Sequence, residues 1–151
     1  MGYGLTAVTF CDFVIASDNA TFSYPEVTIG IPTIVGAIRL PKKLNWSDAM
    51  EFLLLGESIP AERAHEMGFV WKVCSADELI EEANKLAARL CRSAPLAVRA
   101  TKEVATRTQN MGWIEAVRFG ETMRIVANQT EDATEGRTAF KEKRKPKWRA
   151  N

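Results

Sequence analysis

The stretch GYGLTAVTFCDFVIASDNATFSYPEVTIGIP, from Gly2 to Pro32, contains the residues that decide the fold. The apolar run from Gly4 to Cys11 is compatible with a helix or a strand by periodicity alone. Asp12–Ser17 and Thr21–Tyr24 predict two short strands, because β-branched and aromatic residues recur in them. A proline ends the second strand, and Glu26 follows at once. A carboxylate at this corner is either an ordinary solvated loop acid or a group aimed into a pocket.

The rest of the chain is expected to be mostly helical. The expected elements are a short helix within Ile34–Leu44, a helix over Trp46–Gly56 capped by Ser47, a helix over Pro60–Gly68, a strand over Phe69–Cys74, a helix that opens with a Ser75–Glu78 capping box, and helices that begin at Pro95, at Trp113 and after Thr130. The chain changes in character near Asp48: the first third is rich in glycine, proline and β-branched residues, and the rest follows a mostly helical pattern. This order predicts an α/β fold.

The composition excludes several classes of function. A net charge of +1 over 151 residues offers no global attraction for nucleic acid or an anionic membrane. No apolar run reaches the roughly 18 residues that a membrane helix needs, and the first residues lack the basic region of a secretory signal. These features predict a cytoplasmic protein, or one of the mitochondrial matrix in a eukaryote, with no nucleic-acid or membrane partner.

The sequence does not indicate a nucleophilic catalytic site or a metal-binding site. Cys11, Cys74 and Cys91 are widely spaced and form no CxxC pattern, which indicates buried free thiols in a reducing compartment. His65 is the only histidine and has no metal-binding partner nearby in sequence. Carboxylates and backbone amides remain as the groups that can do chemistry, and no metal site is expected.

Two features near the N-terminus can supply those groups. Gly2-Tyr3-Gly4 precedes the first apolar run, and N–H groups at a helix start can form an oxyanion hole, although a tight turn explains the same glycines. Glu26 can act as a general acid or base. The interval between Gly4 and Glu26 accommodates a helix, a strand, a turn and a second strand. That path can return the chain to the helix start and place both groups in one pocket.

The last residues, AFKEKRKPKWRAN, are locally basic. A solvated tail is the ordinary interpretation of such a segment. Contact with the phosphate groups of a ligand is the functional alternative, because charged side chains recognise phosphate oxygens by strong hydrogen bonds. Nuclear targeting is a weaker third reading.

Taken together, these segments resemble the enoyl-CoA hydratase/isomerase (crotonase) family over essentially the whole chain. The resemblance rests on the Gly2–Pro32 stretch, on AMEFLLLGESIPAERAHEMGFVWKV, on SAPLAVRATKE and on DATEGRTAFKEKRKPKW, which occur in the family's order. It implies the distal part of a crotonase-like spiral, a ββα superhelix, over residues 1–75. It also implies a C-terminal helical trimerisation region over residues 76–151, and hence a homo-trimer or a dimer of trimers.

The resemblance also implies roles for particular residues. Glu26 matches the family's catalytic acid/base, and the Tyr3 N–H, between Gly2 and Gly4, matches one of two donors that hold the thioester oxygen. The substrate is then an acyl-CoA thioester, and no cofactor is needed because CoA is part of the substrate. Pocket and CoA contacts are implied for Ile31, Pro32, Thr33, Phe140 and Lys143.

The chain departs from the family at three points. Thr6 stands where hydratases carry a second glutamate, so a one-carboxylate reaction such as double-bond isomerisation fits better than two-carboxylate water addition, with Thr6 at most positioning a water. Tyr3 replaces a small residue. Family members are usually longer, and the second oxyanion donor and most of the CoA-binding loop are expected outside this segment. We therefore expect the chain to need that portion, or an oligomer, for stability.

Two alternatives stay open at this stage. The chain is either an acyl-CoA lyase or isomerase, or a non-catalytic fragment of the family that acts as an oligomerising scaffold. A third reading, hydrolysis or decarboxylation of a CoA thioester on the same scaffold, also needs few carboxylates.

Overall fold

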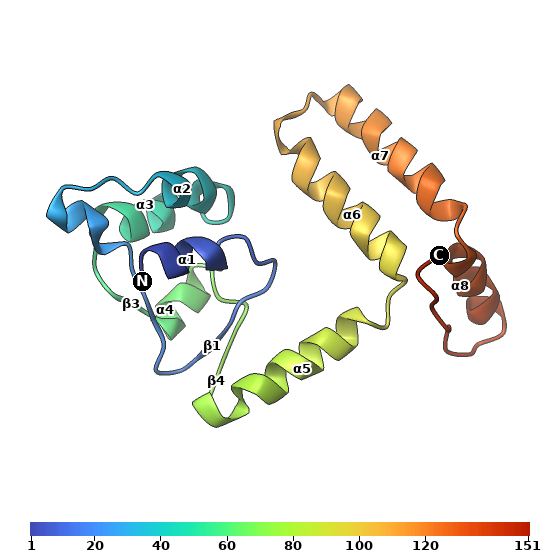
Figure 1. The fold of residues 1–151 in the computed structure, drawn as a ribbon, viewed down its shortest axis with the longest axis horizontal. Coiled ribbons are helices and arrows are strands. Elements are labelled where there is room, and N and C mark those ends of the chain that lie inside the picture. Colours follow the sequence, from blue (N-terminus) through green and yellow to red (C-terminus); the bar gives the residue numbers. More distant parts are fainter. The chain divides into compact units, whose positions relative to one another are not determined.

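A computed structural model describes residues 1–151 and divides the chain into two compact units, Met1–Lys85 and Leu86–Asn151 (Figure 1). The division falls within helix α5 (Leu79–Leu90). It lies ten residues beyond the boundary at residue 75 that the family resemblance implies. Each unit is described by itself below.

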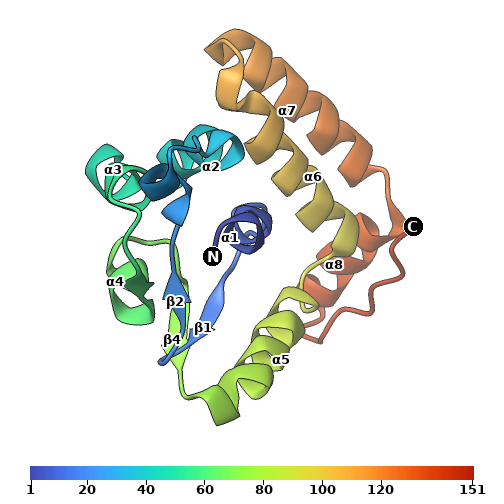
Figure 2. The ribbon, with the colours of Figure 1, turned by 60° about the vertical axis from the view of Figure 1, so that its left-hand side comes forward.

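The first unit combines short helices with two small sheets. Its elements are α1 (Tyr3–Val8), β1 (Ile15–Ser17), β2 (Thr21–Phe22), the 3-10 helix η1 (Pro25–Ile29), α2 (Ile34–Arg39), η2 (Leu40–Lys42), α3 (Trp46–Leu54), β3 (Ile59–Pro60), α4 (Ala61–Glu66), β4 (Lys72–Cys74) and η3 (Ala76–Glu78). β1 pairs with β4 in parallel, with Ala16 opposite Val73, and β2 pairs with β3 antiparallel. The ribbon shows β1 and β4 side by side (Figure 2).

One apolar core holds this unit together. Its buried members are Leu5, Ala16, Tyr24, Leu40, Leu44, Ala49, Phe52, Leu53, Ile59, Ala61, Ala64, Met67, Phe69 and Val70. Phe69 stacks edge-on against Phe22, with ring centres 5.6 Å apart, and also packs on Phe52 at 5.4 Å. Burial of such rings is the main favourable term in folding, so β2, α3 and the segment before β4 are fixed to one another here.

The strands are shorter than the sequence predicts. The expected strand Asp12–Ser17 is confirmed only over Ile15–Ser17, because β4 offers it partners only over Lys72–Cys74. The strand Thr21–Tyr24 ends at Phe22, since the Ser23 carbonyl accepts a hydrogen bond from the Gly2 N–H instead of continuing the ladder. The expected strand over Phe69–Cys74 begins only at Lys72.

Two predicted helix caps are wrong in detail. The N-cap of α3 is Asn45 and not Ser47: the Asn45 side chain accepts from the Asp48 N–H at 3.0 Å. Ser75 does precede η3, but its hydroxyl donates to the Glu78 carboxylate and accepts from no backbone N–H, so no capping box forms. The last helix does begin after Thr130, as expected, and the Thr130 hydroxyl caps it by accepting from the Ala133 N–H at 3.1 Å.

The second unit is helical. It contains the end of α5, α6 (Pro95–Arg107), η4 (Thr108–Asn110), α7 (Trp113–Asn128) and α8 (Glu131–Lys141). α6 and α7 lie side by side as an antiparallel hairpin (Figures 1 and 2). No residue of α5, α6 or α7 is fully buried, so the apolar stripe predicted for α5 is not covered within this chain.

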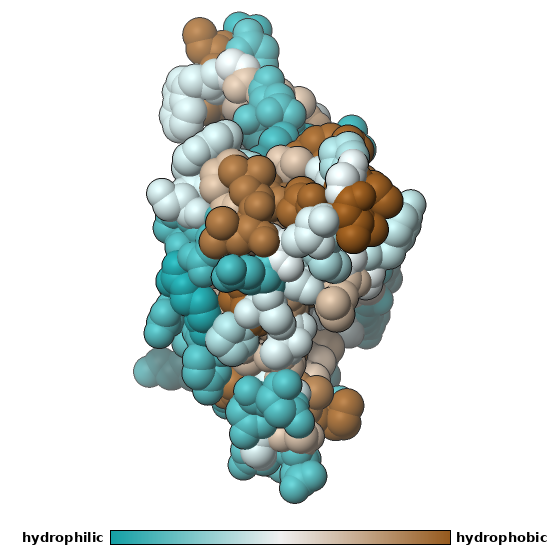
Figure 3. Space-filling model, turned by 90° about the vertical axis from the view of Figure 1, so that its left-hand side faces the viewer, coloured by the Kyte–Doolittle hydropathy of each residue, from teal (hydrophilic) through white to brown (hydrophobic).

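Apolar side chains are exposed on both units, and one face gathers several of them (Figure 3). In the first unit they include Ile29, Ile31, Ile34, Val35 and Ile38, which lie on η1, on α2 and between them; in the second they include Trp113, Ile114 and Val117 at the start of α7. Patches of this kind in a soluble protein commonly mark ligand or protein contacts.

The cysteine prediction is half right. All three thiols are free, but Cys11 and Cys91 are exposed and Cys74 is only half-buried. Cys11 follows the C-terminal end of α1 and Cys91 follows that of α5, where neither side chain faces the core.

Candidate functional site

The start of helix α1 presents an unpaired backbone donor. Gly2 adopts φ 52° and ψ −121°, a conformation that favours glycine, and its N–H donates to the Ser23 carbonyl at 3.0 Å. The first N–H groups of a helix have no partner within it. The Tyr3 N–H also donates to no other part of the chain, while the Tyr3 side chain is 93% exposed and leaves the donor uncovered.

Glu26 lies beside this helix start. It is the second residue of η1, and not part of an irregular loop as a strand-to-loop corner suggests. One carboxylate oxygen, Oε1, approaches the Gly2 backbone so closely that a Cβ added to Gly2 would lie 2.6 Å from it. The Thr33 hydroxyl donates to the other oxygen, Oε2, at 3.4 Å. The carboxylate is therefore held between the glycine turn and the loop before α2.

Two hydroxyl groups stand next to the carboxylate. The Thr6 Oγ1 and the Tyr24 phenolic oxygen are 3.2 Å apart. Tyr24 is fully buried, and burial raises the pKa of its phenol; the Thr6 hydrogen bond lowers this pKa and the Glu26 charge raises it. The phenol is thus neutral at ordinary pH and within the electrostatic reach of Glu26.

Two glycines, having no side chains, allow α2 and the end of α3 to pack closely against Tyr24 and η1. A Cβ on Gly36 would lie 2.7 Å from the Tyr24 ring, so helix α2 can pack directly on the phenol only because position 36 has no side chain. A Cβ on Gly56 would meet Thr28 at 2.5 Å, and Gly56 also has φ 67°, as expected for the residue after the α3 C-cap. The end of α3 therefore supports the 3-10 turn that carries Glu26.

The first unit brings several predicted site residues together. Glu26 lies against Gly2, the residue before Tyr3, and accepts from Thr33. Thr6 is linked to this place through Tyr24, two residues before Glu26. An added Cβ at Gly4 would meet nothing within 4 Å. Ile31 and Pro32 lie exposed on the loop that leads to Thr33.

Sequence reasoning missed Tyr24. It was interpreted only as the last residue of a strand, but its position directly before the Pro25-Glu26 step, together with the unusual Thr6, was a signal that could have identified it. The other predicted contacts, Phe140 and Lys143, belong to the second unit. Phe140 is 86% exposed, and Lys143 adopts φ 55° just after α8.

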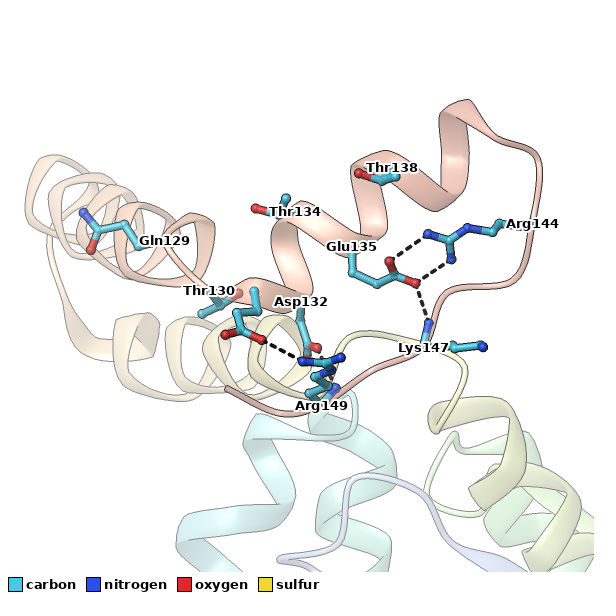
Figure 4. A pocket seen from close by; sticks show the side chains of 10 residues that line it. Gln129, Thr130, Asp132, Thr134, Glu135, Thr138, Arg144, Lys147 and Arg149 are labelled. Atoms are coloured by element: carbon cyan, nitrogen blue, oxygen red, sulfur yellow. Dashed lines mark hydrogen bonds and ion pairs between the residues drawn. The ribbon is translucent and has the colours of Figure 1, made fainter.

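Much of the basic C-terminal segment is used inside the second unit. Arg144 binds Glu135 with both terminal nitrogens, at 2.6 and 2.9 Å, and the Lys147 N–H donates to the same carboxylate (Figure 4). The buried Asp132 carboxylate accepts from the Arg149 and Ala150 N–H groups. These contacts fold residues 144–150 over α8 beside a hollow of about 610 Å³. Most residues of this segment are exposed, as expected for a solvated one, but these contacts order it against α8.

This folded segment is expected to respond to acid. The Arg144 hydrogen bonds, followed by the Lys147 N–H, lower the pKa of Glu135 to about 2. Because the pKa is depressed on folding, the stabilisation exists above about pH 4 and is lost as the pH falls toward 2. Trp148 reports on the segment, since its indole N–H donates to the Arg92 carbonyl. We expect its NMR signal to persist at pH 5 and to move between about pH 4 and 2.

The matched variants are Glu135→Gln and Glu131→Gln. Glu131 makes only a 3.5 Å contact with Arg149 and is more exposed. Glu135→Gln should perturb the Trp148 signal already at pH 7, and Glu131→Gln should not. An unperturbed signal in Glu135→Gln would show that the ion pair does not hold the segment.

The structure contains no group of three or more histidine, cysteine, aspartate or glutamate side chains that could hold a metal ion. His65 instead has its Nδ1 at 2.8 Å from the Val70 carbonyl. None of the helices combines the length and the apolar character needed to cross a membrane.

The family description "Enoyl-CoA hydratase/isomerase" matches residues 1–151. Among curated relatives, carnitinyl-CoA dehydratase of Salmonella arizonae is 37% identical over 155 residues, covering 99% of this chain and 59% of the relative. Carnitinyl-CoA dehydratase of Escherichia coli K12 is 39% identical, covering 98% of this chain and 59% of the relative. The chain thus spans about 59% of the length of these relatives.

Solved structures agree with this match. An enoyl-CoA hydratase/isomerase from Mycobacterium paratuberculosis superposes with a TM-score of 0.93 at 39% identity, covering 99% of this chain and 60% of the other. A probable enoyl-CoA hydratase/isomerase from Mycobacterium abscessus gives a TM-score of 0.94 at 35% identity, with the same coverage. These likenesses confirm the predicted crotonase-like α/β fold.

Proposed function

Because the chain belongs to the enoyl-CoA hydratase/isomerase family, we propose that it binds an acyl-CoA thioester and moves a proton at the carbon next to the thioester carbonyl. The observation that carries the proposal is the position of the Glu26 carboxylate against Gly2, the residue directly before the unpaired Tyr3 N–H at the start of α1. A base and an oxyanion donor in one place are what enolate chemistry requires.

The roles follow from the groups present. Glu26 accepts the proton from Cα, and the electrons of the broken C–H bond pass to the thioester oxygen. The Tyr3 N–H donates to that oxygen as its negative charge develops, so it binds the transition state more strongly than the substrate. Thr33 and Gly2 hold the carboxylate in position through the contacts described above.

Two outcomes are open to a site of this kind. Return of the proton to Cγ of a 3-enoyl-CoA shifts the double bond, and this isomerisation needs only one carboxylate. Loss of a hydroxyl from Cβ is a dehydration, and the names of the curated relatives, carnitinyl-CoA dehydratases, favour it. Because Thr6 is neutral and stands in place of an acid, either outcome relies on Glu26 as the one carboxylate that moves the proton.

CoA binding and assembly are further parts of the proposal. Phe140 and Lys143 stand exposed at the end of α8, where an aromatic ring and an ammonium group are available to the adenine and phosphates of CoA. The uncovered apolar side chains at the start of α7 support packing against other copies, as a homo-trimer or a dimer of trimers.

Absorbance of the conjugated enoyl group tests the proposal. The protein is offered a 3-enoyl-CoA and crotonyl-CoA, and its mass is measured by light scattering after size exclusion. We expect a trimer or hexamer that increases the absorbance of the 3-enoyl-CoA. Loss of crotonyl absorbance would instead indicate water addition, and an assembled protein inactive on both substrates would support the scaffold reading.

A further inference from the structure

The position of the missing second carboxylate is occupied by a pair of hydroxyl groups. Thr6 stands there, and its Oγ1 lies 3.2 Å from the Tyr24 phenol. Thr6 lies one helical turn from Gly2, because its N–H donates to the Gly2 carbonyl, and the Glu26 Oε1 lies close to the Gly2 backbone. The Glu26 charge also acts on the Tyr24 phenol. The pair and the carboxylate are therefore neighbours in one site.

The two hydroxyls differ in acidity and in whether their hydrogen is available to a further partner. A phenol is more acidic than an alcohol and is the better hydrogen-bond donor. Either hydroxyl can be the donor in this pair. Because Tyr24 is 0% exposed and Thr6 is the hydrogen-bond partner of its phenol, we assign the phenolic hydrogen to Thr6. Thr6 is only half-buried, and its Oγ1 makes no other hydrogen bond within the chain. Its own hydrogen is therefore available on the open side of the site.

We propose that Tyr24 is a positioning residue: by donating to Thr6 Oγ1 it directs the Thr6 hydrogen toward an oxygen at Cβ of the bound acyl group, so the site accepts 3-hydroxyacyl-CoA substrates. This rests on the proposed function, with Glu26 as the base. Glu26 takes the Cα proton and the C–O bond at Cβ breaks. The departing oxygen takes the proton from Glu26 and leaves as water, while Thr6 keeps its proton and only donates a hydrogen bond to that oxygen.

The pair is expected to act on the step at Cβ and not on the step at Cα. With 3-hydroxybutyryl-CoA, Thr6→Val and Tyr24→Phe should each lower kcat about 5- to 10-fold, the contribution of one hydrogen bond between neutral groups. The double variant should be no slower than Thr6→Val, because Tyr24 acts through Thr6. Thr6→Ser keeps a hydroxyl and should restore most of the rate.

Exchange of the Cα hydrogens of butyryl-CoA in D2O separates this inference from the proposed function. That exchange depends on Glu26 and involves no oxygen at Cβ, so Thr6→Val and Tyr24→Phe should leave it within about twofold. If both variants lost the exchange, the two hydroxyls would be needed for the action of Glu26 or for folding, and the inference would be overturned. Intact exchange without any dehydration by the unsubstituted protein would also overturn it, while leaving the proposed function in place.

Titration of the phenol gives a readout independent of turnover. The chain has two tyrosines, so a Tyr3→Phe background leaves only Tyr24 to absorb as a phenolate. Glu26→Gln removes a negative charge and should lower the pKa of Tyr24, whereas Thr6→Val removes the hydrogen bond and should raise it. Shifts of opposite sign are the expected result. If neither substitution moved the pKa, the three groups would not share a site and the inference would fail.

Discussion

Replacing Glu26 with glutamine is expected to lower kcat on an enoyl-CoA or 3-hydroxyacyl-CoA substrate by about 10²- to 10⁴-fold. Glutamine has nearly the same shape and still accepts the Thr33 hydrogen bond through its carbonyl oxygen, but it cannot take a proton. The loss should therefore appear in turnover and not in stability. Thermal unfolding and size exclusion check that the fold and assembly are unchanged.

The matched control is Glu57→Gln. Glu57 is an exposed acid in the loop after Gly56, so this variant removes a negative charge from the same unit without touching the site. Its kcat should equal that of the unsubstituted protein. Full activity in Glu26→Gln would remove the catalytic assignment altogether.

The second large effect is expected from Gly2→Ala. At φ 52° and ψ −121° an alanine is strained by about 1–3 kcal/mol. The new Cβ would also lie 2.6 Å from Glu26 Oε1, so the carboxylate must leave its position. A displacement of about 1 Å in a catalytic group can cost about 10²-fold in rate. We expect both a lower melting temperature and a kcat reduced by about that factor.

Gly4→Ala is the stability control for this variant. An added Cβ at Gly4 meets nothing within 4 Å, and alanine favours the helix in which Gly4 lies. Its melting temperature should be unchanged or higher. If Gly2→Ala were as stable and as fast as the unsubstituted protein, the carboxylate could not be held against the glycine turn as the structure shows.

The local signals in the sequence predicted the helices well. Proline at the first position of α6, glycine after α3 and α4, and the Thr130 cap all act through contacts within a few residues, which a pattern can reveal. Strand ends were predicted less well, because the length of β1 depends on how much of β4 it finds as a partner 57 residues away along the chain. The Asn45 cap was overlooked in favour of the nearby Ser47, which has the same chemistry.

The site was predictable in its members but not in its contacts. Glycine, proline and a carboxylate in the Gly2–Pro32 stretch indicated the oxyanion turn and Glu26. The pattern could mark Tyr24 as a candidate beside the Pro25-Glu26 step, but it could not show the hydrogen bond to Thr6, 18 positions away, because that contact exists only when β2 returns to the start of α1. The folded basic segment was missed for the same reason: Arg144 finds Glu135 only once α8 has formed.

Hydrogen exchange at Cα tests the central claim most directly, because it requires only the base and the oxyanion donor. Butyryl-CoA is incubated with the protein in D2O, and the loss of its Cα proton signal is followed by NMR. The account predicts exchange by the unsubstituted protein, and its loss in Glu26→Gln with the assembly unchanged. Equal exchange in both proteins would contradict the assignment of Glu26 as the group that moves the proton.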